Sequence, residues 1–190
     1  MIIEHRINTI GELKNVDKSN GIEVDIRYDS SVKDVVLTHD INFTHNNTLN
    51  DFLHYYNHAL IIFNIKSSLC EEYCIRLMEK FNIKNYLFLD SQIPDIIKYA
   101  KLGYGDKFIT RISKFETYNK NLVSLASKYI WVDTFGEADI SFINQNDNHD
   151  YIFVSPELHK KDENIVILKE MIKQKFDVYH VCTDFKNYWT

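Results

Sequence analysis

Glycine, proline and cysteine are all scarce in this chain, and each shortage removes a class of protein. Five Gly and two Pro among 190 residues exclude collagen-like repeats and long flexible linkers. The three cysteines, Cys70, Cys74 and Cys182, are an odd number, and two of them are spaced as helix neighbours. That pattern gives no disulfide framework. We therefore expect short connections between elements, in a fold that needs no disulfide.

Long apolar runs and an excess of basic charge are also missing. No segment approaches the roughly 18 apolar residues that a membrane span requires. The formal net charge is −5, which gives no basic surface for nucleic acid. The first five residues lack the basic and apolar regions of a secretory signal, so a cytoplasmic protein is expected. The sequence thus favours a small-molecule substrate, with no nucleic-acid partner and no stable membrane span, and leaves the oligomeric state open.

What the chain does contain is a repeated alternation of apolar extended segments with helical segments. Hydrophobic residues make up 45% of the sequence, enough to build the core of one domain over residues 1–190. The predicted strands are 1–6, 21–27, 59–66, 86–90, 107–113, 129–135, 151–157 and 178–185, with 35–38 as an extension of the second strand unit. This alternation predicts a parallel sheet with helical crossovers.

Eight strand units favour one α/β architecture over another. They fit a compact (β/α)8 TIM barrel, although the chain is short for that fold. An open, doubly wound sheet is the alternative. No glycine-rich nucleotide-binding motif supports a nucleotide-binding version of that sheet.

The stretch from Gly21 to Asp40 carries an unusual group of ionisable side chains. Glu23, Asp25 and Arg27 alternate with apolar residues, so all three point to the same face of a strand. The next extended run ends in His39. An edge strand with its polar side in water would give the same alternation. The pattern alone therefore leaves a functional site and a solvated surface both open.

Nearly every other predicted strand also ends in a polar or ionisable residue, and in a barrel of this class the active site lies at those ends. The acidic side chains there suit a hard cation such as Mg²⁺ or Ca²⁺. Cationic Arg27, Lys66 and Arg111 suit an anionic substrate, with phosphate the expected group. Two histidines, His5 and His39, titrate near neutrality and suit a general acid and a general base. Together these residues predict metal-assisted cleavage of a phosphodiester.

A structural interpretation stands beside each of these assignments. Glu23 and Asp25 would need no metal if they paired with Arg27 or Lys66 inside the barrel. Two buried carboxylates this close repel each other unless a cation compensates them, which favours the metal. Lys66 and Arg111 are equally compatible with salt bridges.

The order of these motifs resembles the glycerophosphodiester phosphodiesterase family, within the phospholipase-C-like phosphodiesterase TIM barrels. The resemblance is carried by His5-Arg6, by the E-x-D of Glu23 and Asp25, by His39-Asp40, and by a strand that ends in Lys66. It implies that His5 and His39 are the catalytic acid and base, and that Glu23 and Asp25 hold a divalent metal ion. It also implies a phosphoric diester hydrolase with a glycerophosphodiester-like substrate, whose phosphate Arg6, Lys66 and Arg111 would bind.

Two positions depart from the family pattern. The glycine of H-R-G is replaced by Ile7, and the third metal carboxylate is replaced by Asn64. An amide oxygen can ligate Mg²⁺ or Ca²⁺ but brings no charge, so a weaker metal site is expected. Asp90 and Asp133 are candidates to supply the missing carboxylate.

Because of these departures, two other functions stay open. One is a catalytically impaired barrel that binds a phosphorylated ligand without turning it over. The other is a related barrel that acts on another small phosphorylated metabolite or a sugar phosphate.

Overall fold

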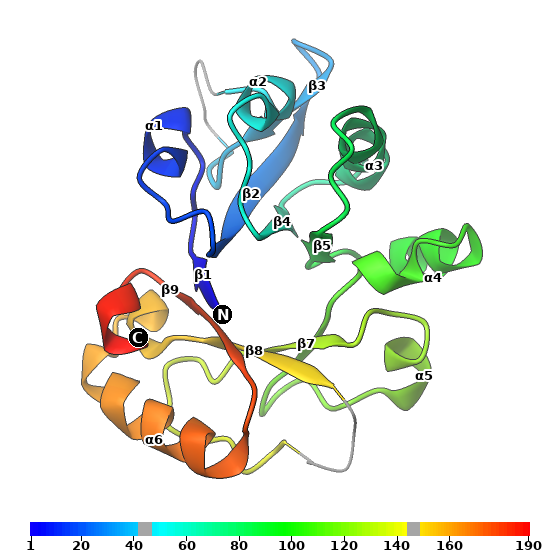
Figure 1. Ribbon diagram of the computed structural model, residues 1–190. Helices are drawn as coiled ribbons and strands as arrows, with labels where there is room; N and C mark the ends of the chain where they lie inside the picture. The colour runs from blue at the N-terminus through cyan, green and yellow to red at the C-terminus, as the bar shows by residue number, and fades with distance from the viewer. Residues whose placement is uncertain (42–46, 144–148) are drawn as a thin grey trace. The chain divides into compact units, whose positions relative to one another are not determined.

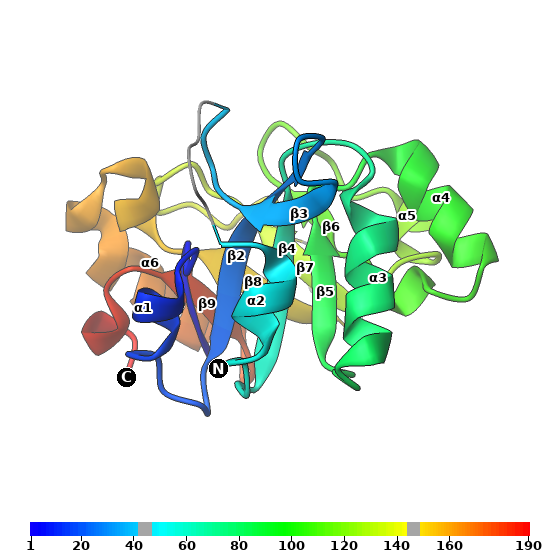
Figure 2. The same ribbon diagram turned by 90° about the horizontal axis from the view of Figure 1, so that it is seen from above.

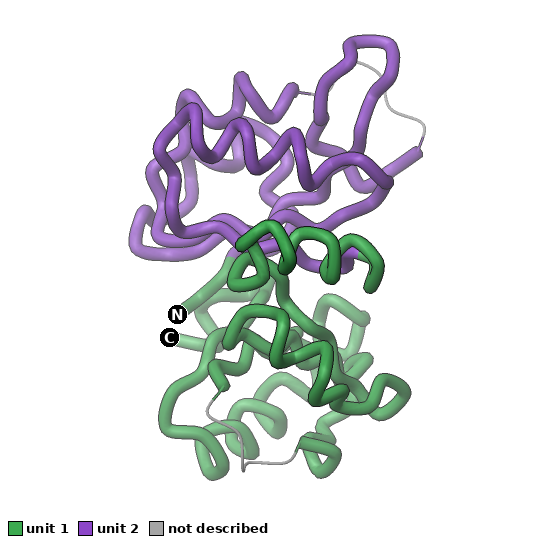
Figure 3. The backbone as a smooth tube through the Cα atoms, turned by 90° about the vertical axis from the view of Figure 1, so that its right-hand side faces the viewer, with its two compact units in different colours: residues 1–3, 92–190 green, residues 4–91 purple. Residues whose placement is uncertain are grey.

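The computed structural model describes residues 1–41, 47–143 and 149–190. Contacts within the chain divide it into two compact units (Figure 3). One unit comprises Met1–Ile3 and Gln92–Thr190, and the other comprises Glu4–Ser91. We call these the first and the second unit. The single domain expected over residues 1–190 stays a prediction.

The second unit is a parallel sheet with short helices and one antiparallel hairpin. In chain order its elements are α1 (Ile10–Leu13), β2 (Gly21–Asp29), β3 (Asp34–Leu37), α2 (Leu49–Leu53), β4 (Leu60–Ile65), α3 (Cys70–Lys80) and β5 (Tyr86–Leu89). The parallel strands lie in the order β5-β4-β2, and α2 and α3 lie along one face of this sheet (Figures 1 and 2). β3 pairs antiparallel with β2, so the segment expected to extend the second strand unit folds back on it.

The polar face of β2 lies inside the protein. Residues Gly21 to Ile26 of this strand are buried on both faces, and Glu23 and Asp25 are as buried as the apolar residues that alternate with them. The apolar residues of the strand are fully buried, as are Phe52 of α2 and Phe63 of β4. An edge strand with its polar side in water is therefore excluded.

The first unit repeats the same alternation of strands and helices. Its elements are β1 (Ile2–Glu4), within which the chain passes into the second unit, then α4 (Ile93–Lys101), the 3-10 helix η1 (Gly105–Lys107), β6 (Thr110–Ile112), α5 (Lys120–Val123), β7 (Tyr129–Val132), β8 (Asp150–Val154), the 3-10 helices η2 (Pro156–His159) and η3 (Asp162–Asn164), α6 (Ile165–Lys175), β9 (His180–Thr183) and the 3-10 helix η4 (Lys186–Tyr188). The strands β6 to β9 pair in parallel with their sequence neighbours. The parallel pairing predicted from the sequence is thus confirmed within each unit.

The core of the first unit is built mainly from the strands and from α6. Phe153, Val181 and Leu168 lie in one cluster of buried apolar side chains, and Trp189 packs into it from the end of the chain. The indole of Trp189 also donates a hydrogen bond of 2.8 Å to Ser155, so its polar atom is satisfied on burial.

None of the described helices is both long enough and apolar enough to span a membrane.

His180, the first residue of β9, is expected to make the stability of the protein depend on pH. Its Nδ1 atom is buried without a hydrogen-bond partner among the described residues. Burial lowers the pKa of His180 to about 4, and the N-terminal ammonium group acts in the same direction. Since the unfolded chain takes up this proton near the ordinary histidine pKa of about 6.5, the folded state loses stability as the pH falls from there towards 4.

We expect this loss to be on the order of 1 kcal/mol, because the ring is partly exposed and solvent screens its charge. Urea unfolding of the wild type and of His180→Gln at pH 7 and pH 4.5 measures it. The Gln variant should lose less stability than the wild type over this interval. Equal losses in the two proteins would show that His180 does not contribute.

Candidate active site

Glu23 is a buried carboxylate on β2 that is only partly satisfied. Its side chain is 1% exposed. One oxygen, Oε2, accepts a hydrogen bond of 2.8 Å from the backbone amide of Arg6, while Oε1 is buried without a partner among the described residues. Burial and then the charge of Asp25 raise the pKa of Glu23, against smaller opposite effects of His5, Arg6 and Asn64. Glu23 therefore has an oxygen available for a further donor or a cation.

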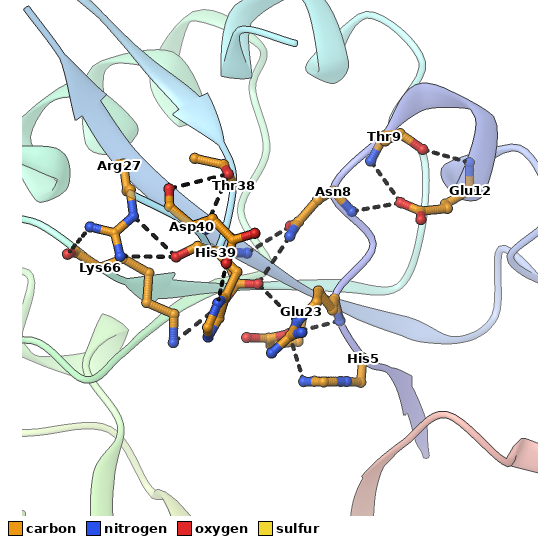
Figure 4. Close-up of polar contacts among 12 residues, drawn as sticks. His5, Asn8, Thr9, Glu12, Glu23, Arg27, Thr38, His39, Asp40 and Lys66 are labelled. Atoms are coloured by element: carbon orange, nitrogen blue, oxygen red, sulfur yellow. Dashed lines mark hydrogen bonds and ion pairs between the residues drawn. The ribbon is translucent and has the colours of Figure 1, made fainter. Parts of the chain in front are cut away.

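Asp25 lies two residues further along β2 and is held by three side chains from two segments, the β1–α1 connection and the end of β4. Asn8 and Lys66 are labelled in Figure 4. Asn8 donates from Nδ2 to Asp25 Oδ2 at 2.9 Å and accepts from the Asp25 amide at 2.8 Å. Arg6 Nε lies 3.4 Å from Oδ2, and Lys66 Nζ lies 3.3 Å from Oδ1. The cations that pair with Asp25 are thus Arg6 and Lys66 rather than Arg27.

His5 follows β1 and is the histidine nearest to the buried carboxylates. Its Nε2 atom lies 4.0 Å from Glu23 Oε2, and its side chain is 21% exposed. The next residue, Arg6, has φ 54, a left-handed conformation that costs energy for a residue with a Cβ atom. This turn directs the Arg6 amide at Glu23, so the backbone strain lies directly beside the candidate site.

His39 enters the same unit at the end of β3. The preceding residue, Thr38, donates its amide to the carbonyl of Asp25 at 2.9 Å. The His39 ring is 45% exposed, and its Nδ1 atom lies 3.1 Å from Oδ1 of Asp40, which is itself exposed. The second predicted histidine is therefore solvent-accessible and has a carboxylate as its neighbour.

Asn64 occupies the position on β4 directly opposite Asp25 in the parallel register. Its Oδ1 atom is buried without a hydrogen-bond partner among the described residues, as is Glu23 Oε1. Within the described ranges, no three His, Cys, Asp or Glu side chains gather as a metal site. Two carboxylates and one amide thus form the predicted ligand group, with one unpaired oxygen on Glu23 and one on Asn64.

The other predicted site residues follow different strands. Asp90 follows β5 and is exposed. Arg111 and Asp133 belong to the first unit, where Arg111 Nη1 lies 3.3 Å from Asp133 Oδ2. The other carboxylate oxygen, Oδ1, lies 2.9 Å from His159 Nε2. Arg111 and Asp133 therefore form a salt bridge, as the structural interpretation of Arg111 expected, and their roles in phosphate or metal binding stay predictions.

Sequence reasoning missed Asn8 and His159. Asn8 was recognisable only as a polar residue near the start of a helix, and its two hydrogen bonds to Asp25 depend on tertiary structure. His159 lies in η2, beyond the end of β8, and nothing in its sequence neighbourhood indicates that Asp133 is its partner.

No protein-family model matches this chain, and no curated protein matches it either. Two solved structures are similar to it along nearly its whole length. The first is a glycerophosphodiester phosphodiesterase from Agrobacterium tumefaciens str. C58, with a TM-score of 0.67, 12% identity, and coverage of 96% of this chain and 95% of that chain. This chain has the fold of that phosphodiesterase. The second, a glycerophosphoryl diester phosphodiesterase from Parabacteroides distasonis ATCC 8503, has a TM-score of 0.55, 11% identity, and coverage of 97% and 82%.

The similarity confirms the predicted (β/α)8 TIM-barrel fold of the phosphodiesterase type. Enzymes with this fold carry their active sites at the carboxyl ends of the strands. In the second unit those ends carry His5 after β1, Asp25 near the end of the β2–β4 pairing, and Lys66 after β4. The fold and the geometry thus agree on where a site would lie.

Proposed function

We propose that this protein is a phosphoric diester hydrolase that cleaves a glycerophosphodiester-like substrate with the help of a divalent metal ion. The observation that carries the proposal is the pair of buried carboxylates, Glu23 and Asp25, beside two cations and a histidine at the strand ends of one unit. A site that combines negative oxygens, positive side chains and imidazole suits a phosphate group bound together with a metal ion.

The residues present fit a divalent cation. Glu23 Oε1 and Asn64 Oδ1 are buried oxygens without a partner among the described residues, and Asp25 adds a second carboxylate. Oxygen ligands of this kind are those that Mg²⁺ and Ca²⁺ prefer. When bound, the ion would neutralise negative charge that builds up on the phosphate oxygens.

The chain's own side chains would then carry the proton transfers. One of the two histidines, His5 or His39, removes the proton of the attacking hydroxyl, which belongs to water or to a neighbouring group of the substrate. The new P–O bond forms as the ester P–O bond breaks, and the other histidine protonates the departing alkoxide. Arg6 and Lys66, both cationic, orient the phosphate by charge-assisted hydrogen bonds.

Asn64 offers a direct test of the ligand group. Asn64→Asp restores a carboxylate at this position, and we expect it to lower the Kd for Mg²⁺ or Ca²⁺ at least about tenfold, because a negative oxygen replaces a neutral one. Isothermal titration calorimetry measures the Kd without any substrate. Asn50→Asp, a change of the same chemistry on α2, is the control. An unchanged Kd in Asn64→Asp would remove Asn64 from the proposed ligands.

The activity itself is tested with a panel of glycerophosphodiesters in Mg²⁺, Ca²⁺ or Mn²⁺. Phosphorus NMR distinguishes the phosphodiester from its products, which are a phosphomonoester or a cyclic phosphate according to the attacking hydroxyl. The appearance of either product supports the proposal. Binding of the substrates without turnover contradicts it.

That second outcome is the other candidate function, a barrel that binds a phosphorylated ligand without turning it over. One observation favours it. Asn64 lacks the charge of the expected carboxylate, while both oxygens of Asp25 already lie close to cationic side chains, Arg6 and Lys66. These cations would still hold a phosphate if no metal ion were bound.

A further inference from the structure

Arg27 has a bonding pattern that differs from that of every other cation in the candidate site. Its guanidinium donates from Nε and Nη2 to the backbone carbonyl of His39, at 3.2 Å and 2.9 Å, and from Nη1 to the backbone carbonyl of Lys66 at 2.9 Å. Within the described residues, no carboxylate forms an ion pair with it. Figure 4 shows the side chain reaching from β2 to both neighbours. Arg27 thus binds the main chain of two residues whose side chains the proposed function uses.

The positions of these carbonyls explain why an arginine is needed. Leu37, the last residue of β3, and Ile65, the last residue of β4, both pair with Ile26 of β2. Beyond those pairs, the amides of Thr38 and Lys66 still donate to β2, at the carbonyls of Asp25 and Ile26. The carbonyls of His39 and Lys66 themselves accept from the Arg27 side chain. Arg27, the next residue of β2, supplies three hydrogen bonds at this point.

We propose that Arg27 is a positioning residue that fixes the backbones of His39 and Lys66 relative to β2, and so holds the imidazole and the ammonium group in register with Asp25. This inference rests on the proposed function for its catalytic consequence. The planar guanidinium presents five donors in a fixed fork, which reaches two carbonyls at once. A lysine ammonium has a single nitrogen and cannot reproduce that geometry.

The test is Arg27→Lys, which keeps the charge and removes the fork. We expect hydrogen exchange of the peptides covering residues 38–41 and 64–68 to become faster by about tenfold or more, since Arg27 no longer holds the carbonyls of His39 and Lys66. With a glycerophosphodiester as substrate and Mg²⁺ present, kcat should fall by about 10–100-fold because the reacting groups are displaced. KM should change by less than about threefold, since the phosphate-binding cations remain.

The matched control is Arg76→Lys, an exposed arginine of α3 that pairs with Glu72 one turn away. It should leave both exchange and kcat unchanged. Unchanged exchange in Arg27→Lys overturns the proposal, and so does faster exchange with an unchanged kcat. If the wild type shows no turnover at all, the proposed function fails, and the positioning of the two backbones is then supported or overturned by the exchange result alone.

Discussion

Replacing either His5 or His39 with alanine is expected to lower kcat by about 10²–10⁴-fold, the range over which a positioned acid or base contributes. The two residues come from separate segments, after β1 and after β3, and each is partly exposed. Neither substitution opens a large cavity in the core, so both variants should fold. Steady-state kinetics on a glycerophosphodiester, with the fold verified by circular dichroism, measures the effect.

The same two variants reveal which histidine is the acid. A 4-nitrophenyl ester leaves as a stable phenolate and needs no proton, whereas an alkoxide does. The variant that lacks the acid should therefore recover most of its activity on a 4-nitrophenyl phosphodiester, while the variant that lacks the base should not. His54→Ala, an exposed histidine at the end of α2, is the control. Full activity of both His5→Ala and His39→Ala on the glycerophosphodiester would contradict two-histidine catalysis.

Glu23→Gln is expected to abolish stabilisation by metal ions without destabilising the metal-free protein. At a concentration of 100 Kd, an ion that binds only the folded wild type raises the free energy of unfolding by about 2.7 kcal/mol. The neutral amide in the variant should remove nearly all of this increase. In the absence of metal, the variant should be at least as stable as the wild type, because ionised Glu23 is buried beside Asp25 and burial opposes its charge.

Thermal unfolding in EDTA and in Mg²⁺ or Ca²⁺ separates these two effects. Glu170→Gln, an exposed carboxylate that pairs with Lys173 on α6, is the control and should keep the full metal response. A metal response that survives in Glu23→Gln would place the ion elsewhere.

The sequence predicted the strands well because most are apolar runs of the right length, and β2 alternates apolar and charged residues as a strand does. It also placed Glu23 and Asp25 on one face, since that follows from the two-residue repeat of any strand. It could not decide whether this face meets water or the interior. That depends on the neighbouring strands, and the structure answers it with two carboxylates that are each 1% exposed.

The partners of the site residues could not be predicted in the same way. Arg27 was expected to meet an anion, yet it binds two backbone carbonyls, which every residue carries and which therefore leave no signal in a sequence. Asn8 directly precedes Thr9, the cap of α1, and its side chain holds Asp25, which lies 17 residues away in the sequence. Such contacts depend on how the connections between strands and helices bring distant residues together. Composition and spacing do not determine the path of those connections.

The most direct test of the central claim compares the wild type with the His5→Ala/His39→Ala double variant on a glycerophosphodiester panel. Both proteins are first loaded with Mg²⁺, Ca²⁺ or Mn²⁺, and turnover is followed by phosphorus NMR. We predict hydrolysis by the wild type at a rate at least about 10²-fold above that of the double variant. Equal rates in the two proteins, on every substrate and with every metal ion, would contradict the assignment of this site as a phosphodiesterase.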